Sequence, residues 1–376
     1  MSGVYLHIPF CKQACHYCDF HFSTNTAVKG ELIECMAEEI AMQKNYLEGE
    51  TVKTIYFGGG TPSLADPQEL SRLLELVFTN HTVAPKAEIT LEANPDDLTF
   101  ETLQHLRAVG INRLSIGIQS FDDAILKYLN RAHDMAAAIE SVHLARRAGF
   151  ENISIDLIYA IPGMTERMWE DNLAMALELN PPHVSAYTLT IEEKTTFGNW
   201  LKKGKLQMTD EASSARQFQT LTSTLSAAGY DHYEISNFSR PGYQSQHNSS
   251  YWSGEKYLGI GPGAHSYDGE SRQFNIPNNQ LYIRSIREGT IPFEREILTA
   301  RDRINEFIFT GLRTSRGCSI RVLKEKFGHD LLHAQRSYLE RLSQQRLVSI
   351  EDEYLRLTDA GRLLADRICS DLFLVE

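Results

Sequence analysis

The chain lacks any apolar run of about 18 residues, the length that a membrane-spanning helix needs, so we expect no transmembrane segment. Its first residues contain no basic stretch followed by an apolar one, so no secretory signal is predicted and a cytoplasmic location is expected. Net positive charge is absent as well, because 37 basic and 49 acidic residues give a formal charge of −12. Nucleic-acid binding depends on clustered positive charge, so nucleic acid is not expected as a partner.

Cysteine is also scarce, with six residues in 376. A disulfide framework would need more cysteines, spread more evenly, and would belong to a secreted chain. Three of the six, Cys11, Cys15 and Cys18, fall within eight residues. This local cluster indicates a metal site.

Short apolar segments alternate with helical patterns along the first half of the chain, which favours an α/β fold with a parallel sheet. Six strands are predicted, at 4–8, 53–58, 87–92, 113–119, 153–158 and 183–189. Helices are predicted at 28–47, 67–79, 99–109, 122–129, 135–149, 166–179 and 210–228. Six such units predict a partial (β/α)6 barrel.

Three regions are predicted: the partial barrel at 1–230, a barrel extension at 231–298 and a C-terminal domain at 299–376. In the last region, helical patterns at 300–314, 319–327 and 331–346 precede a short strand pair and a final helix from Asp359, which resembles a winged helix. It has 13 basic and 12 acidic residues from Arg301 onward. This balance does not favour DNA binding.

The predicted strands carry polar side chains on one face. Glu92, Gln119 and Asp156 alternate with apolar neighbours, so that the apolar face would pack on the outer helices and the polar face would line the barrel lumen. An ordinary barrel fills its lumen with Val, Ile and Leu. Buried carboxylates without partners would cost several kcal/mol. The groups satisfy one another or, as we favour, bind a polar ligand.

The cysteines form a C-x3-C-x2-C motif directly after the first predicted strand. Three thiolates are one ligand short of a closed zinc site and of a fully ligated four-iron cluster, which leaves an open coordination position. A zinc site completed by His16, Asp19 or His21 is the alternative.

The motif resembles the radical S-adenosylmethionine (SAM) signature, in which three cysteines hold a [4Fe-4S] cluster and SAM chelates the fourth iron. Gly58-Gly59-Gly60-Thr61-Pro62 at the end of the second strand resembles the loop that receives the methionyl amine in that superfamily.

The resemblance narrows to the oxygen-independent coproporphyrinogen III oxidase family through six segments: YLHIPFCKQACHYCDF, GGGTP, LEANPDD, INRLSIGIQSF, LNRAH and IDLIYAIPG. It implies SAM contacts, and packing of Phe20 near the adenine. The implied SAM residues are Tyr5, Phe20, Gly59, Gly60, Thr61, Glu92, Gln119, Arg131 and Asp156. No catalytic residue is assigned.

Within that family the oxidases typically continue the motif as C-x3-C-x2-C-x-C, whereas Phe20 occupies the last position here. They also carry a longer segment before the cluster. Both departures match a shorter branch of haem chaperones, marked by H-N-x-x-Y-W, which corresponds to residues 247–252. The resemblance implies haem binding and delivery to haem-requiring proteins, including respiratory enzymes at the inner face of the membrane. It is also compatible with a homodimer.

Imidazole is a common axial ligand of haem iron, and aromatic side chains offer flat apolar faces to a porphyrin. His247 is the first choice of ligand, with Tyr251 and Trp252 beside it, and the alternative is that His247 is a hydrogen-bonded structural histidine. His265, in the segment GIGPGAHS, is the second choice. The alternative function is an oxygen-independent coproporphyrinogen III dehydrogenase, or a radical SAM enzyme acting on another tetrapyrrole.

Overall fold

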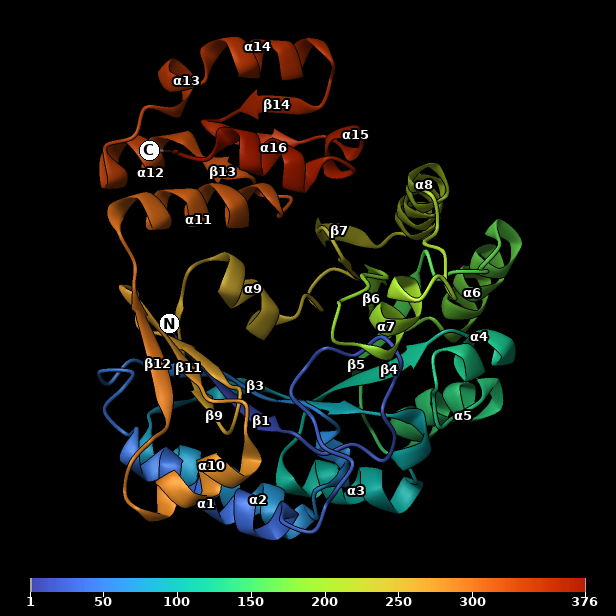
Figure 1. Ribbon diagram of the computed structural model, residues 1–376, viewed down its shortest axis with the longest axis vertical. Coiled ribbons are helices and arrows are strands. Elements are labelled where there is room, and N and C mark those ends of the chain that lie inside the picture. The colour runs from blue at the N-terminus through green and yellow to red at the C-terminus, as the bar shows by residue number, and fades with distance from the viewer. Residues whose placement is uncertain (1, 376) are drawn as a thin grey trace.

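A computed structural model describes residues 2–375, and its main feature is a long curved sheet with helices on its outer side (Figure 1). Twelve strands follow the order β12-β11-β10-β9-β1-β2-β3-β4-β5-β6-β8-β7. They are β1 (Ser2–Ile8), β2 (Val52–Gly59), β3 (Val83–Ala93), β4 (Arg113–Gln119), β5 (Asn152–Tyr159), β6 (His183–Thr188), β7 (Asp231–Glu234), β8 (Asn237–Ser239), β9 (Lys256–Ile260), β10 (His265–Tyr267), β11 (Ser271–Asn275) and β12 (Phe293–Ile297).

The strands β1 to β6 pair in sequence order and all are parallel, which confirms the predicted (β/α)6 partial barrel. The segment that follows extends the sheet at both edges. β8 and β7 add antiparallel strands beside β6, whereas β9 pairs parallel to β1 and carries the antiparallel β10, β11 and β12.

The helices of the barrel lie mainly on the convex side of the sheet, and α9 lies on the concave side (Figure 1). They are α1 (Lys29–Met42), α2 (Pro67–Asn80), α3 (Phe100–Val109), α4 (Asp123–Tyr128), α5 (Met135–Arg147), α6 (Glu166–Leu179), α7 (Thr196–Lys202), α8 (Glu211–Ala227), α9 (Gln246–Trp252) and α10 (Asn279–Arg287). Two 3-10 turns occur at Pro62–Leu64 and Pro95–Asp97. Several helices start at Thr or Asp residues whose side chains accept a backbone N–H of the first turn, as at Thr99, Asp134 and Thr165.

The period-two pattern of the strands is confirmed in β4. Leu114, Ile116 and Ile118 are fully buried in the hydrophobic core beneath the outer helices. Arg113 and Ser115 alternate with them and are buried too, on the concave face. The concave face therefore holds polar groups away from water, which is where ligand chemistry is expected.

The C-terminal part forms a smaller unit with its own hydrophobic cluster and a three-stranded sheet of order β13-β15-β14. Its helices and strands are α11 (Ala300–Leu312), β13 (Cys318–Ser319), α12 (Ile320–Phe327), α13 (Leu331–Ala334), α14 (Arg336–Gln344), β14 (Val348–Glu351), β15 (Tyr354–Leu357), α15 (Asp359–Arg362) and α16 (Ala365–Leu372). Helices with a small antiparallel sheet match the predicted winged-helix-like pattern. Within residues 2–375, no helix is long and apolar enough to cross a membrane.

Candidate functional site

The loop of Cys11, Cys15 and Cys18 leaves the carboxyl end of β1 and is tied to its surroundings by backbone hydrogen bonds. Cys11 N donates to Ser23 O at 3.0 Å, and His16 N donates to Leu129 O at 3.1 Å. All three thiols are free and partly exposed. This loop is therefore held in place before any metal is bound.

The three thiols lie near enough to influence one another. Burial, together with the neighbouring Cys15 and Cys11, raises the pKa of Cys18 to about 12. Among the described residues, no group of three or more His, Cys, Asp or Glu side chains is arranged to hold a metal ion. Three thiols nevertheless suit a four-iron cluster with one open iron. Hydrogen bonds to two of the sulfur atoms would stabilise the thiolates: Thr61 Oγ1 donates to Cys11 Sγ at 3.5 Å, and Arg131 donates to Cys15 Sγ at 3.2 Å.

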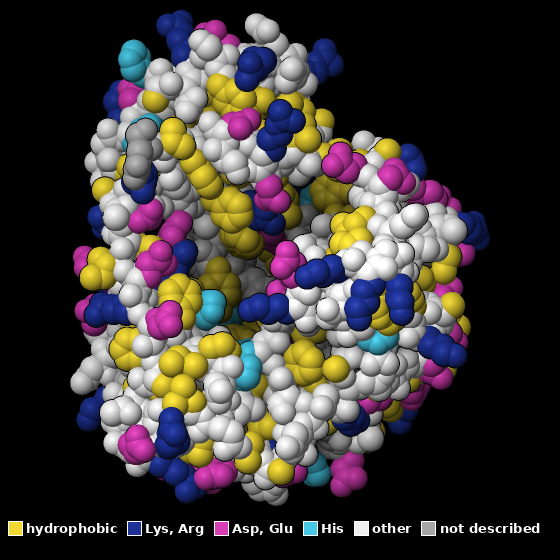
Figure 2. All heavy atoms as spheres, viewed as in Figure 1, with side chains coloured by type: hydrophobic (Ala, Val, Ile, Leu, Met, Phe, Trp, Pro, Cys, Tyr) yellow, Lys and Arg dark blue, Asp and Glu magenta, His cyan; other side chains and the backbone are white. Residues whose placement is uncertain are grey.

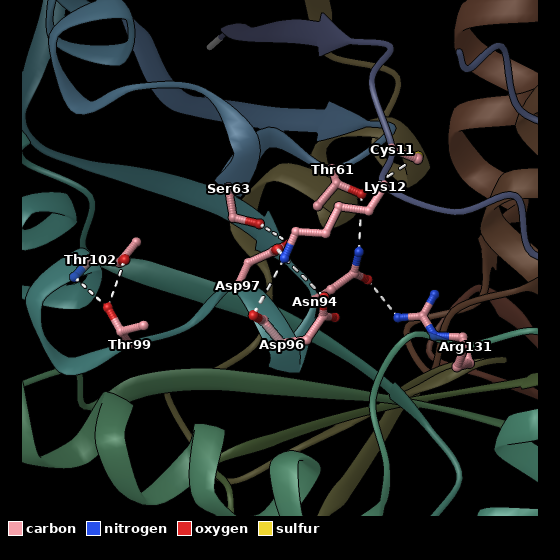
Figure 3. A network of polar contacts seen from close by, with 10 residues as sticks. All are labelled: Cys11, Lys12, Thr61, Ser63, Asn94, Asp96, Asp97, Thr99, Thr102 and Arg131. Atoms are coloured by element: carbon pink, nitrogen blue, oxygen red, sulfur yellow. Dashed lines mark hydrogen bonds and ion pairs between the residues drawn. The ribbon is translucent and has the colours of Figure 1, made fainter. Parts of the chain in front are cut away.

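A chain of polar contacts joins Cys11 to Cys15 past the ends of β2 and β3, and Figure 3 shows its part from Cys11 to Arg131. Asn94 Nδ2 donates to Thr61 Oγ1 at 3.0 Å, and the guanidinium of Arg131 donates to Asn94 Oδ1. Cys11 and Cys15 are thus linked by three side chains. Asn94 is absent from the residues predicted by resemblance. It shares a strand face with Glu92, so the period-two pattern contains the signal that identifies it.

The glycines of the Gly58–Pro62 segment are needed because the backbone of β1 and its loop comes very close. A Cβ on Gly60 would lie 2.6 Å from Phe10 N, and a Cβ on Gly59 would lie 2.6 Å from the His7 ring. Gly59 also has a φ of +106°. The segment therefore seats the cysteine loop against β2.

The lumen carboxylates predicted from the strand pattern lie together on the concave face. Glu92 accepts hydrogen bonds from Tyr56 OH at 2.8 Å and from Gly59 N at 3.2 Å. Burial, together with the nearby Asp156, raises the pKa of Glu92 to about 7, although the hydrogen bonds from Tyr56 and Gly59 oppose the shift. Burial also raises the pKa of Asp156, whose oxygens accept from Ser115 Oγ at 3.2 Å. Tyr56 is a lumen residue that the resemblance did not supply.

Gln119 and Arg131 stand at the same end of the lumen. Gln119 has a φ of +70°, where the pairing of β4 with β5 shifts register. Arg131 donates to Gly117 O at 2.7 Å, directly beside this irregularity. The structure therefore gathers the carboxyl ends of β2 to β5 around the cysteine loop, as chemistry at the strand ends of such barrels requires.

The predicted haem residues do not share one environment. His247, on α9, is buried; its Nδ1 is hydrogen-bonded to Thr54 Oγ1 at 2.8 Å and its Nε2 to Tyr251 OH at 2.8 Å. Trp252 points to the C-terminal unit, where the Arg313 guanidinium lies 5.5 Å from its ring centre. His265 lies exposed at the start of β10.

A cavity of about 630 Å³ opens between the cysteine loop and the β9–β11 edge of the sheet. Its lining includes residues from both, namely Tyr5, His7, Asp19, Phe20, His21, Tyr251, Tyr257, Gly263, His265, Phe274, Asn275 and Pro277. This volume is typical of small-molecule sites. Two predicted SAM residues, Tyr5 and Phe20, and two predicted haem residues, Tyr251 and His265, thus meet in one cavity.

These features define a radical SAM protein, and sequence comparison agrees. The radical SAM superfamily matches residues 5–176, and the HemN C-terminal domain matches residues 298–364. The structure of the Escherichia coli coproporphyrinogen III oxidase HemN is similar over 99% of this chain and 90% of that chain, with a TM-score of 0.85 and 25% sequence identity.

Curated relatives are more similar in sequence. The Heme chaperone HemW of Bacillus subtilis (strain 168) is 36% identical over 373 residues, which cover 98% of each chain. The Heme chaperone HemW of Escherichia coli (strain K12) is 33% identical over 388 residues, covering 100% of this chain and 98% of the other. The chain therefore belongs to the HemW family of radical SAM proteins.

Proposed function

We propose that this protein binds haem and transfers it to haem-dependent proteins, and that it carries a [4Fe-4S] cluster and SAM. The observation that carries the proposal is the similarity, over 98% of the chain, to relatives named heme chaperones. Acceptors include respiratory enzymes in the membrane, which the protein would meet at the cytoplasmic face.

In this proposal Cys11, Cys15 and Cys18 ligate three irons of the cluster, and the fourth iron is left for SAM. The reduced cluster supplies one electron to the SAM sulfonium when both are bound. The chain's own part is to orient SAM in the lumen through its carboxylates, amide and backbone groups. The proposed SAM residues remain Tyr5, Phe20, Gly59, Gly60, Thr61, Glu92, Gln119, Arg131 and Asp156.

The test has two parts. Anaerobic reconstitution should give about four irons and four sulfides per chain in the wild type, and the triple variant of Cys11, Cys15 and Cys18 to Ser should give none. A Cys35→Ser variant is the matched control, because Cys35 is buried in the helical core.

To measure haem transfer, the reconstituted protein is loaded with haem and mixed with a haem-free acceptor. The absorbance spectrum of the acceptor is then recorded over time. We expect the spectrum of the haem-loaded acceptor to appear faster when haem comes from this protein than when it comes from a non-specific carrier such as albumin. Failure of the wild type to bind haem would refute the carrier function.

The second candidate is oxidative decarboxylation of coproporphyrinogen III, favoured by the likeness to HemN. Phe20 stands where many oxidases have a further cysteine, and its side chain is 68% exposed beside the cluster loop. Release of CO2 from coproporphyrinogen III by the reconstituted protein, in proportion to SAM cleavage, would support this candidate over the carrier.

A further inference from the structure

The cavity between the cysteine loop and the sheet edge contains an aromatic surface on one face of the sheet. β10 and β11 pair His265 with Phe274 and Tyr267 with Arg272, and Tyr257 of β9 pairs with Tyr267. Because paired residues in adjacent strands point to the same side, these groups form a continuous strip. The strip is aromatic apart from Arg272, whose guanidinium forms an ion pair with Glu306 of α11 at 2.9 Å.

His265 differs from the other histidines of the cavity in having a free imidazole. His7 uses both ring nitrogens, with Tyr5 OH at 3.2 Å and the His21 carbonyl at 3.0 Å. His21 Nε2 is hydrogen-bonded to Asn279 Oδ1 at 2.7 Å. Across residues 2–375, neither ring nitrogen of His265 has a hydrogen-bond partner, and the ring stands edge-on to Phe274 at 4.8 Å.

The backbone that presents His265 is a preformed structure. A Cβ on Gly259 would lie 2.1 Å from the His265 carbonyl oxygen, so the β9–β10 turn closes tightly only around glycine. The buried carboxylate of Glu39 accepts from Gly261 N at 2.8 Å and from Asn275 Nδ2 at 2.7 Å. The backbone at His265 is therefore held by buried contacts.

Phe20 of the cysteine loop also lines this cavity, and its ring is exposed. An aromatic side chain that is 68% exposed costs hydrophobic free energy unless another flat apolar group covers it. Figure 2 shows a hollow between the barrel and the C-terminal unit, with hydrophobic and histidine side chains at its rim.

We propose that this cavity is the haem-binding site, with His265 as the axial ligand of the iron and the macrocycle between Phe20 and Phe274. This inference rests on the proposed carrier function and names its binding site. The step is a coordination in which a neutral imidazole nitrogen donates its lone pair to ferric iron, and no bond breaks. Burial and the charge of Arg272 lower the pKa of His265, which keeps the ring neutral.

The rival ligand is His247. To bind iron, its ring would have to give up a hydrogen bond to Thr54 or to Tyr251 and leave its stack on Tyr56, where the ring centres are 4.9 Å apart. That change would also move α9 within the concave face. His265 binds without any such rearrangement.

The experiment is a titration of the full chain with ferric haem, followed by the Soret band and by electron paramagnetic resonance, for wild type, His265→Ala, His247→Ala and His143→Ala. His143 is an exposed histidine of α5 and is the matched control. We expect His265→Ala to weaken haem binding at least tenfold and to lose the imidazole-type spectrum, which added imidazole should restore. His143→Ala should behave as wild type.

A His265→Tyr variant tests direct ligation, because a phenolate ligand gives a charge-transfer band that imidazole does not. Its appearance supports His265, and its absence with an unchanged Soret band contradicts it. If His265→Ala keeps the wild-type spectrum and affinity while His247→Ala loses them, this site is wrong and the carrier function stands. If the wild type binds no haem, both are wrong.

Discussion

At the scale of single residues, the lumen contains two carboxyl groups, Glu92 and Asp156, whose pKa values are raised by burial. Glu92 is the clearest case, since its pKa of about 7 lies above the usual value for a glutamate. The charged and titratable groups that face it are Tyr5, Tyr56, Arg113, Asp156 and Tyr251. If Glu92 accepts hydrogen bonds from the ribose hydroxyls of SAM, only its ionised form accepts from both.

SAM affinity should therefore rise between pH 6 and pH 8, as Glu92 loses its proton in the ligand-free protein. Glu92→Gln should bind SAM about 10- to 100-fold more weakly at pH 8, because a charge-assisted hydrogen bond contributes roughly 1.5–3 kcal/mol. The variant should also lose most of the pH dependence. Calorimetry of the reconstituted protein at pH 6, 7 and 8 measures both effects, with the exposed Glu140→Gln as control; equal slopes in Glu92→Gln and wild type would contradict the prediction.

Sequence patterns located part of this site. The alternation in β3 to β5 identified Glu92, Gln119 and Asp156 as lumen residues. Successive side chains of a strand point to opposite faces, so a polar residue at every second position is a strong local signal. Tyr56 was hidden in an apolar segment, KTIYFG, where an aromatic side chain reads as core. Its hydroxyl contact with Glu92 depends on the neighbouring strand, which no local pattern contains.

At the scale of elements, Glu39 of α1 joins three segments that are distant in the chain. Besides Gly261 N and Asn275, it accepts a hydrogen bond from Tyr282 OH of α10 at 2.6 Å. Burial raises the pKa of Glu39 to about 7, although these three donors oppose the shift. The loop that carries His265 is therefore fastened to the helical layer by one carboxylate.

A glutamate with a raised pKa in the folded state holds its proton more tightly than in the unfolded chain. The stability it contributes is present at low pH and is lost as pH rises from about 4.5 to about 7. Glu39→Gln should remove this dependence and should lower the free energy of unfolding at pH 5 by roughly 1–3 kcal/mol. Urea unfolding at pH 5 and pH 7.5 checks this.

The exposed neighbour Glu38 on the same helix supplies the control, Glu38→Gln. An unchanged difference between wild type and Glu39→Gln at the two pH values would show that Glu39 does not titrate in this range.

Elements with strong periodicity were predicted to within a few residues, as β4 at 113–119 and α6 at 166–179 show. Within the predicted barrel extension at 231–298, the sequence predicts no individual helices or strands. Its strands β7, β8 and β10 have three or four residues, and α9 has seven, too few for a periodic pattern. They form because they pair with existing sheet edges or pack on the concave face.

At the scale of the whole molecule, two hydrophobic clusters meet through a small set of contacts. Ile235 N donates to Arg313 O at 3.0 Å, and Ser315 N donates to Tyr233 O at 2.9 Å. The guanidinium of Arg313 also covers Trp252, at the end of α9. The C-terminal unit thus rests on the helix that contains His247.

Arg313→Ala should loosen this contact by about 1 kcal/mol, since a cation–π pair at a partly exposed position contributes roughly that amount. We expect the C-terminal unit to unfold at lower urea concentration than the barrel, with a red shift of tryptophan emission attributable to Trp252. Fluorescence-monitored unfolding measures this, and Trp252→Phe identifies the signal. The exposed Arg367→Ala is the control, and an unfolding curve of Arg313→Ala that matches it would contradict the prediction.

The position of α9 also affects the path by which ligands reach the lumen. This helix packs on the amino ends of β1 and β2 and occupies that end of the concave face, so the lumen is approached from the cysteine-loop end, where Tyr5 and His7 also line the cavity. Haem held against Phe20, as proposed above, would lie at this end of the lumen. We therefore expect bound haem to slow the entry and release of SAM, so that SAM binds faster to the haem-free protein.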